Sequence, residues 1–314
     1  MENVSIIGCG TMGHSIALSA AWAGQSVKVY GINEKDLENA DKGLHNKLKV
    51  MTDNDVFDEA TAKQIREKIV LSTSLEETIA GSTFIFEVIP EVLDMKKEMY
   101  KQIESMISEE VVIASNTSGF KPSLLAEEMQ YPNRFVVTHF WNPAHLIPLV
   151  EIVKGEKTDE QTVERAMQVI KDMKKQPILL NKEIPGFIGN RLQYALFREA
   201  QSLLDTGVAT KEDIDAAVTY SIGRRLPVTG PLMTADMGGL DVFSAISNYL
   251  FEDLSMDQKS GTVLSKLVEE NKLGDKNGEG FYTWDAEFSE QKNAEREQTL
   301  IHFLKNDLKR NEEK

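Results

Sequence analysis

A glycine-rich run near the N-terminus, Gly8-Cys9-Gly10-Thr11-Met12-Gly13, constrains the fold of this chain more than any other sequence feature. The run has the form GxGxxG. It follows a short apolar segment (residues 4–7), opens a helix-forming stretch (residues 12–23) and is followed by a second apolar segment (residues 27–30). The glycine pattern alone is weak evidence, but this strand–turn–helix–strand context is typical of a dinucleotide-binding unit and disfavours a merely structural turn.

Each part of the run has an expected role. Gly8 permits the tight turn, Gly10 lets the backbone approach a pyrophosphate, and Gly13 lets the helix pack close to the sheet. Exposed N–H groups at the helix start, at Thr11 and Met12, then hold the phosphates together with the helix dipole.

The end of the second strand leaves the choice of cofactor open. NAD enzymes usually carry an acidic residue there, which binds the adenosine ribose, but this chain has Gly31. Asn33 or Glu34 could substitute from the loop. Otherwise the usual bar against a 2′-phosphate is missing, and Lys35 could favour NADPH. We therefore expect NAD, with NADP as the alternative.

The order of strand-like and helix-like segments predicts two domains. Alternation in the first half indicates an α/β fold with a mostly parallel, Rossmann-like doubly wound sheet. The strand-like runs are residues 4–8, 27–31, 84–89, 111–115, 134–140, 149–153 and 177–180, and the later ones are close enough together to suggest some antiparallel pairing. From Pro185 only long amphipathic segments follow. We predict an α/β domain over residues 1–184 and an all-helical C-terminal domain over residues 185–314, in which residues 294–309 form either a solvated tail or a packed helix.

Composition excludes several classes of protein. A formal net charge of −15 disfavours binding to nucleic acid or to anionic membranes. No apolar stretch approaches the length of a membrane span, and no basic segment indicates a signal peptide. The one cysteine, Cys9, allows no intrachain disulfide, which fits a cytoplasmic protein, and we expect it to be a small side chain in the turn rather than a nucleophile.

One histidine and one glutamate stand where a catalytic pair is expected. His139 ends an apolar strand, and Glu151 lies in the next apolar strand, beyond a turn with Pro143 and Pro148. Adjacent strands would bring the two side chains together, so that histidine serves as a general base and the carboxylate orients it. The alternative is an ordinary hydrogen-bonded histidine at a strand end. No metal is expected, because the other histidines show no ligand spacing.

The motifs together resemble the 3-hydroxyacyl-CoA dehydrogenase family over about the first 285 residues. The matching pieces are residues 8–13, 90–91 with 96–97, 115–118, 139–143, 185–191, 230–231, 239–241 and 276–282. The resemblance implies a Rossmann-like domain, a helical C-terminal domain that forms a homodimer, and hydride transfer at C3 of the substrate. It also implies that His139 is the base with Glu151 as its partner, that Ser118 and Asn190 hydrogen-bond the reacting oxygen or support the histidine, and that Glu91, Lys96 and Asn116 belong to the cofactor site.

The substrate has two candidate classes. The resemblance implies a short-chain (S)-3-hydroxyacyl-CoA, which is the substrate we expect and whose adenosine diphosphate would need cations such as Lys42, Lys47 and Lys49. The family also includes gulonate and carnitine dehydrogenases, which use free hydroxy acids, and Arg224 or Arg225 could pair with a free carboxylate. A surface arginine at a helix end is the alternative interpretation. A non-catalytic, lambda-crystallin-like dinucleotide-binding protein is a third hypothesis, disfavoured by the intact set of catalytic candidates.

Overall fold

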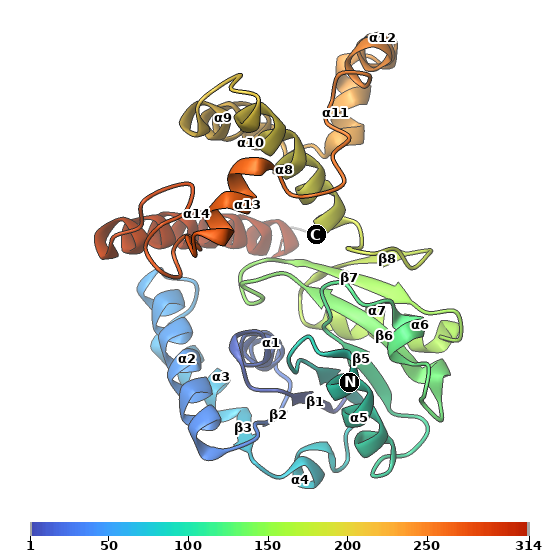
Figure 1. Ribbon diagram of the computed structural model, residues 1–314. Helices are drawn as coiled ribbons and strands as arrows, with labels where there is room; N and C mark the ends of the chain where they lie inside the picture. Colours follow the sequence, from blue (N-terminus) through green and yellow to red (C-terminus); the bar gives the residue numbers. More distant parts are fainter. Residues whose placement is uncertain (1, 313–314) are drawn as a thin grey trace. The chain divides into compact units, whose positions relative to one another are not determined.

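The computed structural model describes residues 2–312. The chain divides into two compact units, one made of residues 1–189 together with 295–314 and the other of residues 190–294 (Figure 1). The predicted fold class, a Rossmann-like α/β sheet followed by an all-helical part, is confirmed. No helix in the described part of the chain is long and apolar enough to cross a membrane.

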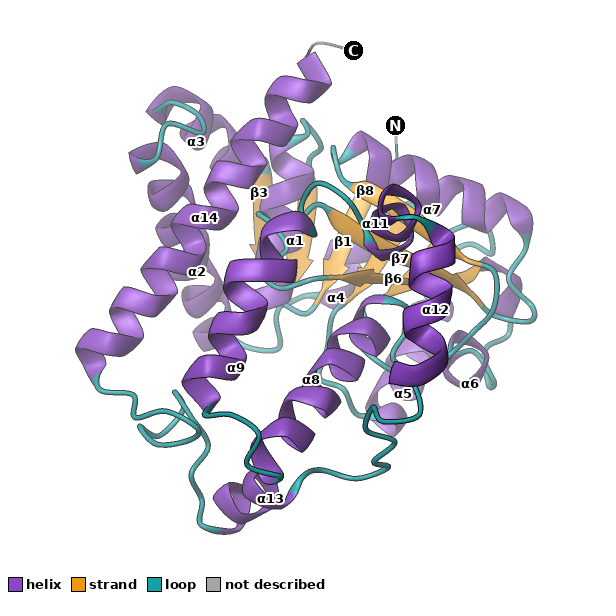
Figure 2. Cartoon of the chain, turned by 90° about the horizontal axis from the view of Figure 1, so that it is seen from above, coloured by secondary structure: helices purple, strands orange, loops and turns teal. Residues whose placement is uncertain are grey.

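The first unit is built on one eight-stranded sheet, drawn in orange in Figure 2, whose strand order is β3-β2-β1-β4-β5-β6-β7-β8. Its strands are β1 (Val4–Ile7), β2 (Val27–Tyr30), β3 (Ile69–Ser72), β4 (Phe84–Glu87), β5 (Val112–Ser115), β6 (Phe135–Phe140), β7 (Leu149–Lys154) and β8 (Gln176–Leu180). All neighbours are parallel except β6 and β7. The expected antiparallel pairing therefore falls on the two strands that carry His139 and Glu151.

The sheet contains one strand more than the sequence analysis predicted. β3 lies at the edge and pairs only with β2. Only its first residue, Ile69, is buried, and Val70 is 55% exposed. The central strands β1, β4 and β5 are buried throughout, as a sheet covered on both faces requires, and therefore read as continuous apolar runs. An edge strand gives a weaker pattern because fewer of its side chains enter the core.

Helices cover both faces of the sheet. They are α1 (Thr11–Trp22), α2 (Glu34–Asp53), α3 (Glu59–Glu67), α4 (Leu75–Ile79), α5 (Leu93–Glu104), α6 (Pro122–Leu125), the short η1 (Pro132–Arg134) and α7 (Glu160–Asp172). Buried residues of α1, α2, α3 and α7 share one apolar cluster, and those of α4, α5 and α6 share the other. This arrangement puts the start of α1 beside the ends of the central strands.

The named elements of the second unit are all helices. Its elements are α8 (Gly189–Asp205), α9 (Lys211–Ala217), the π-helical η2 (Val218–Ile222), α10 (Gly223–Arg225), α11 (Pro231–Gly238), α12 (Leu240–Leu250) and α13 (Thr262–Glu269). The last helix, α14 (Ala286–Glu312), ends in the first unit, where Ile301 and Leu304 are buried in the cluster of α1 and α2. Residues 294–309 thus belong to a packed helix rather than to a solvated tail.

Candidate active site

The glycine-rich turn between β1 and α1 needs glycine at two of its positions for steric reasons. Gly8 has a φ of +110°, and a Cβ there would lie 2.6 Å from the carbonyl oxygen of Val88. A Cβ on Gly13 would lie 1.8 Å from the carbonyl oxygen of Gly8, so α1 approaches the turn too closely for any side chain. A Cβ on Gly10, in contrast, would meet nothing within 4 Å. The turn is therefore closely packed at Gly8 and Gly13, whereas the space beside Gly10 is open.

The N-terminus of α1 is suited to an anion. Gly10 is the N-cap and supplies no side-chain hydrogen bond, and the first turn contains no acidic residue. The first N–H groups of a helix have no partner within the helix, and the dipole places partial positive charge there. The amides from Gly10 to Gly13 therefore fit the pyrophosphate of a dinucleotide, and no side chain needs to move.

At the end of β2, the acidic residue that an NAD site usually carries would require neighbouring side chains to shift. A Cβ on Gly31 would lie 2.6 Å from Cδ2 of Leu37 and 2.7 Å from Sγ of Cys9. Asn33 is engaged as the N-cap of α2, where its side chain accepts from the Asp36 amide. Burial raises the pKa of the Cys9 thiol, with the charge of Asp36 adding to the effect, which disfavours the nucleophilic thiolate form.

His139 and Glu151 face each other across β6 and β7, in register. Nδ1 of His139 lies 2.8 Å from Oε2 of Glu151. Because a carboxylate accepts, the proton is on Nδ1 and Nε2 is left as the basic atom. The histidine ring also lies between two aromatic rings, with centroid distances of 5.6 Å to Trp141 and 5.4 Å to Phe187. The arrangement is that of a general base held in one tautomer by a carboxylate.

Glu151 is fully buried and is held in its charged form by hydrogen bonds. Its second oxygen accepts from the backbone amides of Ile188 at 2.8 Å and Gly189 at 2.9 Å, and Trp141 donates to Oε2 at 3.3 Å. Burial by itself would raise the pKa of Glu151, but the hydrogen bonds from His139 and the two amides outweigh it and lower that pKa. The carboxylate can therefore stabilise an imidazolium on His139.

A second buried carboxylate, Glu87 at the end of β4, was not among the predicted residues. It receives hydrogen bonds from Lys96 at 2.7 Å, Tyr100 at 2.5 Å and Ser115 at 2.7 Å. Both Glu87 and Lys96 are completely buried. Lys96 thus lies behind Glu91, 3.5 Å from its carboxylate, rather than at an open surface. A charged residue inside the apolar run of β4 was the signal that could have revealed this network.

Glu91, Asn116 and Ser118 gather where β4 and β5 end. Glu91 accepts from the hydroxyl of Thr117 and, at 3.1 Å, from the amide of Ser118. The side chain of Asn116 accepts from the amide of Phe140 at 2.8 Å, next to His139. Because β4, β5 and β6 are parallel, these three predicted residues lie at the same edge of the sheet as His139. Open α/β sheets bind their ligands at this edge.

The remaining candidates belong to the helical unit. Asn190 is in the first turn of α8. Arg224 and Arg225 form α10 and are exposed. The guanidinium of Arg224 lies 5.3 Å from the ring centroid of Tyr220, and its Nε donates to the carbonyl of Thr219. Arg225 is exposed, whereas Arg224 is engaged by Tyr220 and Thr219, so Arg225 is the better candidate of the two for a ligand.

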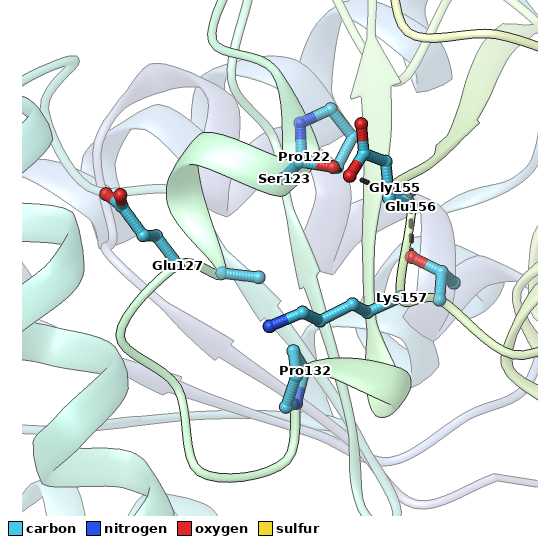
Figure 3. Close-up of a pocket in the computed structure, with 9 residues that line it drawn as sticks. Pro122, Ser123, Glu127, Pro132, Gly155, Glu156 and Lys157 are labelled. Atoms are coloured by element: carbon cyan, nitrogen blue, oxygen red, sulfur yellow. Dashed lines mark hydrogen bonds between the residues drawn. The ribbon is translucent and has the colours of Figure 1, made fainter.

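Neither a metal site nor the small cavity in Figure 3 competes with this site. No group of three or more possible metal ligands occurs among the described residues. The cavity, of about 120 Å³, lies between the start of α6 and the loop after β7, at the opposite end of β6 from His139 (Figure 3). Its polar groups are engaged locally, as where the Ser123 hydroxyl accepts from the Glu156 amide. We assign it no function.

Comparison with known proteins covers nearly the whole chain. A family model described as the NAD binding domain of 3-hydroxyacyl-CoA dehydrogenase matches residues 3–184, and the C-terminal domain of the same family matches residues 186–284. A Mesorhizobium japonicum protein named 5-formyl-3-hydroxy-2-methylpyridine 4-carboxylate 5-dehydrogenase is 33% identical over 96% of both chains. The mitochondrial hydroxyacyl-coenzyme A dehydrogenase of Sus scrofa is 34% identical over 90% of this chain and 91% of its own.

The solved structure of a 5-formyl-3-hydroxy-2-methylpyridine 4-carboxylic acid 5-dehydrogenase, described as an NAD⁺-dependent dismutase, superposes with a TM-score of 0.90. It is 32% identical, and the match covers 96% of this chain and 97% of that one. The similarity therefore includes α14, which lies beyond the end of the C-terminal family model.

Proposed function

Because this chain belongs to the 3-hydroxyacyl-CoA dehydrogenase family, we propose that it catalyses reversible hydride transfer between a carbinol carbon of its substrate and a nicotinamide cofactor, with His139 as general base. Members of the family are NAD-dependent oxidoreductases that act on 3-hydroxy groups. The observation that carries the proposal is the buried His139–Glu151 pair, which leaves Nε2 of the histidine as the basic atom.

The protein side chains transfer the proton and orient the substrate, and the nicotinamide, when bound, accepts the hydride. In the oxidation direction, Nε2 of His139 takes the hydroxyl proton as the C–H bond of the same carbon breaks. The imidazolium formed in this step is stabilised by Glu151 at 2.8 Å. In the reverse direction His139 returns the proton to the carbonyl oxygen. Ser118 and Asn190 are proposed as hydrogen-bonding partners of that oxygen.

The cofactor site extends from the N-terminus of α1 to the strand ends. The amides from Gly10 to Gly13 are proposed to bind the pyrophosphate, and Glu91 and Asn116 to border the nicotinamide. Lys96 is proposed to act through Glu91, because its own ammonium is buried between Glu87 and Glu91. The cofactor is NAD, with NADP tolerated, because the end of β2 carries no carboxylate that would repel a 2′-phosphate.

For the substrate we propose a small compound that carries its own carboxylate and no coenzyme A. Two of the three lysines that could bind the adenosine diphosphate of coenzyme A, Lys47 and Lys49, have partners within the chain. Lys47 donates to His14 at 2.9 Å, and Lys49 pairs with Asp53 at 2.9 Å. In the groove between α2 and α3 that Lys42 lines, Arg66 pairs with Asp41 at 2.6 Å. Paired cations attract a polyanion less strongly than free ones do.

Similarity to a dehydrogenase of a free pyridine carboxylate over 96% of the chain supports the same substrate class. Arg225 is the residue we propose to pair with the substrate carboxylate. The second candidate, an (S)-3-hydroxyacyl-CoA, is supported by the family itself and by the similarity to hydroxyacyl-coenzyme A dehydrogenase. Both candidates use the same hydride transfer and differ only in how the substrate is held.

The test is a matrix of initial rates in the reduction direction. Acetoacetyl-CoA and acetoacetate are each offered with NADH and with NADPH. We expect turnover of acetoacetate, or of a larger free 3-oxo acid in the same assay, to exceed that of acetoacetyl-CoA. We expect NADPH to be accepted to within about tenfold of NADH, the equivalent of about one hydrogen bond at the ribose.

Faster turnover of acetoacetyl-CoA would replace the free acid with the acyl-CoA candidate. The variant Arg225→Ala further distinguishes the two substrate candidates, because it should raise KM for the free acid and leave KM for an acyl-CoA unchanged. The neighbouring Arg224→Ala is the matched control. Cofactor binding without turnover of any oxo acid or oxoacyl-CoA would contradict the proposed activity and favour a non-catalytic protein.

We also propose that the helical unit forms a homodimer. Within residues 190–294 only one hydrophobic residue, Ile214, is as buried as the core of the first unit. Large apolar side chains of α11 and α12 are exposed, among them Leu232 at 84%, Met237 at 76% and Tyr249 at 66%. A unit of this size needs a buried apolar core to be stable, and a second copy would provide the missing cover.

Sedimentation velocity of the purified chain should show a dimer at micromolar concentration. Leu232→Glu/Met237→Glu, which places two charges on that surface, should shift the protein to monomers, whereas Met95→Glu/Met106→Glu, on the exposed side of the first unit, should not. A monomeric wild-type chain would contradict the proposal.

A further inference from the structure

A histidine that the proposed reaction does not use lies directly beneath the glycine-rich turn. His14 is on α1 and is 6% exposed. Its Nδ1 is 3.2 Å from the carbonyl oxygen of Cys9, and its Nε2 is 2.9 Å from Nζ of Lys47 on α2. A lysine ammonium has only donors, so Nε2 must accept and the proton must be on Nδ1. His14 therefore donates to the Cys9 carbonyl, and Lys47 sets the tautomer in which it can do so.

This hydrogen bond orients one peptide group. In a trans peptide the C=O and the following N–H point in opposite directions. Holding the Cys9 oxygen against His14 therefore directs the Gly10 N–H away from the protein. The space over Gly10 is open, and its N–H has no acceptor among residues 2–312. Gly10 is also the N-cap of α1, so its N–H joins the amides proposed to bind the pyrophosphate.

The helix packing is adapted to the position of the histidine. A Cβ on Gly43, in the middle of α2, would lie 2.6 Å from Nε2 of His14. Glycine inside a helix is destabilising relative to alanine, so its presence there needs a reason. The close approach of the histidine ring supplies one.

The charges around His14 keep it neutral. Burial lowers the pKa of His14, and the ammonium of Lys47 lowers that pKa further. Burial also lowers the pKa of His145, in the loop after β6, to about 3, and that of Lys175, before β8, to about 7. Burial lowers the pKa of Lys47 as well, and the charge of Glu297 on α14 opposes that shift only in part. A second cation at His14 is thus disfavoured, and the ring acts as a hydrogen-bond donor rather than as a charge.

We propose that His14 is a positioning residue for the cofactor: its Nδ1–H holds the Cys9–Gly10 peptide so that the Gly10 amide meets the pyrophosphate, and Lys47 keeps His14 in the required tautomer. This inference rests on the cofactor site proposed above and extends it to two residues outside the glycine-rich run. It also links α14 to the glycine-rich turn, because the charge of Glu297 acts on Lys47 and Lys47 contacts His14.

The experiment measures the dissociation constant of NADH by fluorescence titration of the full chain. His14→Leu fills the space but cannot donate, and the dissociation constant should rise about tenfold, the effect of one hydrogen bond. His14→Asn places an amide nitrogen near the position of Nδ1 and should restore binding to within about threefold of wild type. A purely structural role for the ring would predict no such rescue.

Lys47→Met provides an independent test if His14→Leu does not fold. Loss of the lysine donor allows the other histidine tautomer, so the dissociation constant should rise in the wild-type background but not in the His14→Asn background. Equal NADH binding by His14→Leu and wild type would overturn the proposal, as would an equal effect of Lys47→Met in both backgrounds. Failure of the wild-type chain to bind NADH would instead reject the cofactor site itself, and binding without turnover would reject only the reaction.

Discussion

Replacement of His139 by glutamine is expected to lower kcat by about 10²–10⁴-fold, the usual effect of losing a general base. Glutamine can still hydrogen-bond to Glu151, but it cannot take a proton from the substrate hydroxyl at neutral pH. His139 lies at the end of β6, away from the glycine-rich turn, so the pyrophosphate site is left intact. The dissociation constant of NADH should therefore change little while kcat falls.

The measurement pairs steady-state kinetics with an NADH titration of the same preparation. His302→Gln is the matched control, because His302 is exposed on α14, where it hydrogen-bonds to Asn306 and lies beside the ring of Phe303. We expect wild-type kcat for this control. Undiminished turnover by His139→Gln would show that another group takes the proton, and weakened NADH binding would show that the change reaches beyond the base.

Replacement of Glu87 by glutamine is expected to lower the free energy of unfolding by about 3 kcal/mol or more. The ammonium of Lys96 is completely buried and loses its 2.7 Å partner. Glu91, at 3.5 Å and partly exposed, compensates only in part. Tyr100 and Ser115 also donate to Glu87, and the amide that replaces the carboxylate accepts their hydrogen bonds less strongly.

Urea unfolding at neutral pH measures the effect. Adding Lys96→Met to Glu87→Gln removes the uncompensated charge, so the double variant should be more stable than Glu87→Gln alone. Lys101→Met, which breaks the exposed pair of Lys101 with Glu128, should change stability little. Equal stabilities of Glu87→Gln and wild type would mean that Lys96 is not held as a buried cation.

The sequence was informative about the fold because its strongest signals are local. The apolar runs of β1, β4 and β5 are continuous since those strands are buried on both faces, and the glycine-rich turn follows directly from one of them. The edge strand β3 escaped prediction because most of its side chains lie outside the core. The candidate pair His139 and Glu151 could be named because a single turn separates their strands.

The sequence by itself indicated the strands other than β3, the glycine-rich turn and the identity of the titratable groups, all of which depend on near neighbours along the chain. Only the tertiary structure decided which charges are paired. Lys96 is buried against Glu87, Lys47 is engaged by His14, and Gly31 faces Leu37 and Cys9. The physical reason is that burial and charge pairing depend on elements that are distant in the sequence. Whether a lysine binds a ligand, pairs with a carboxylate or donates to a histidine depends on which element packs beside it.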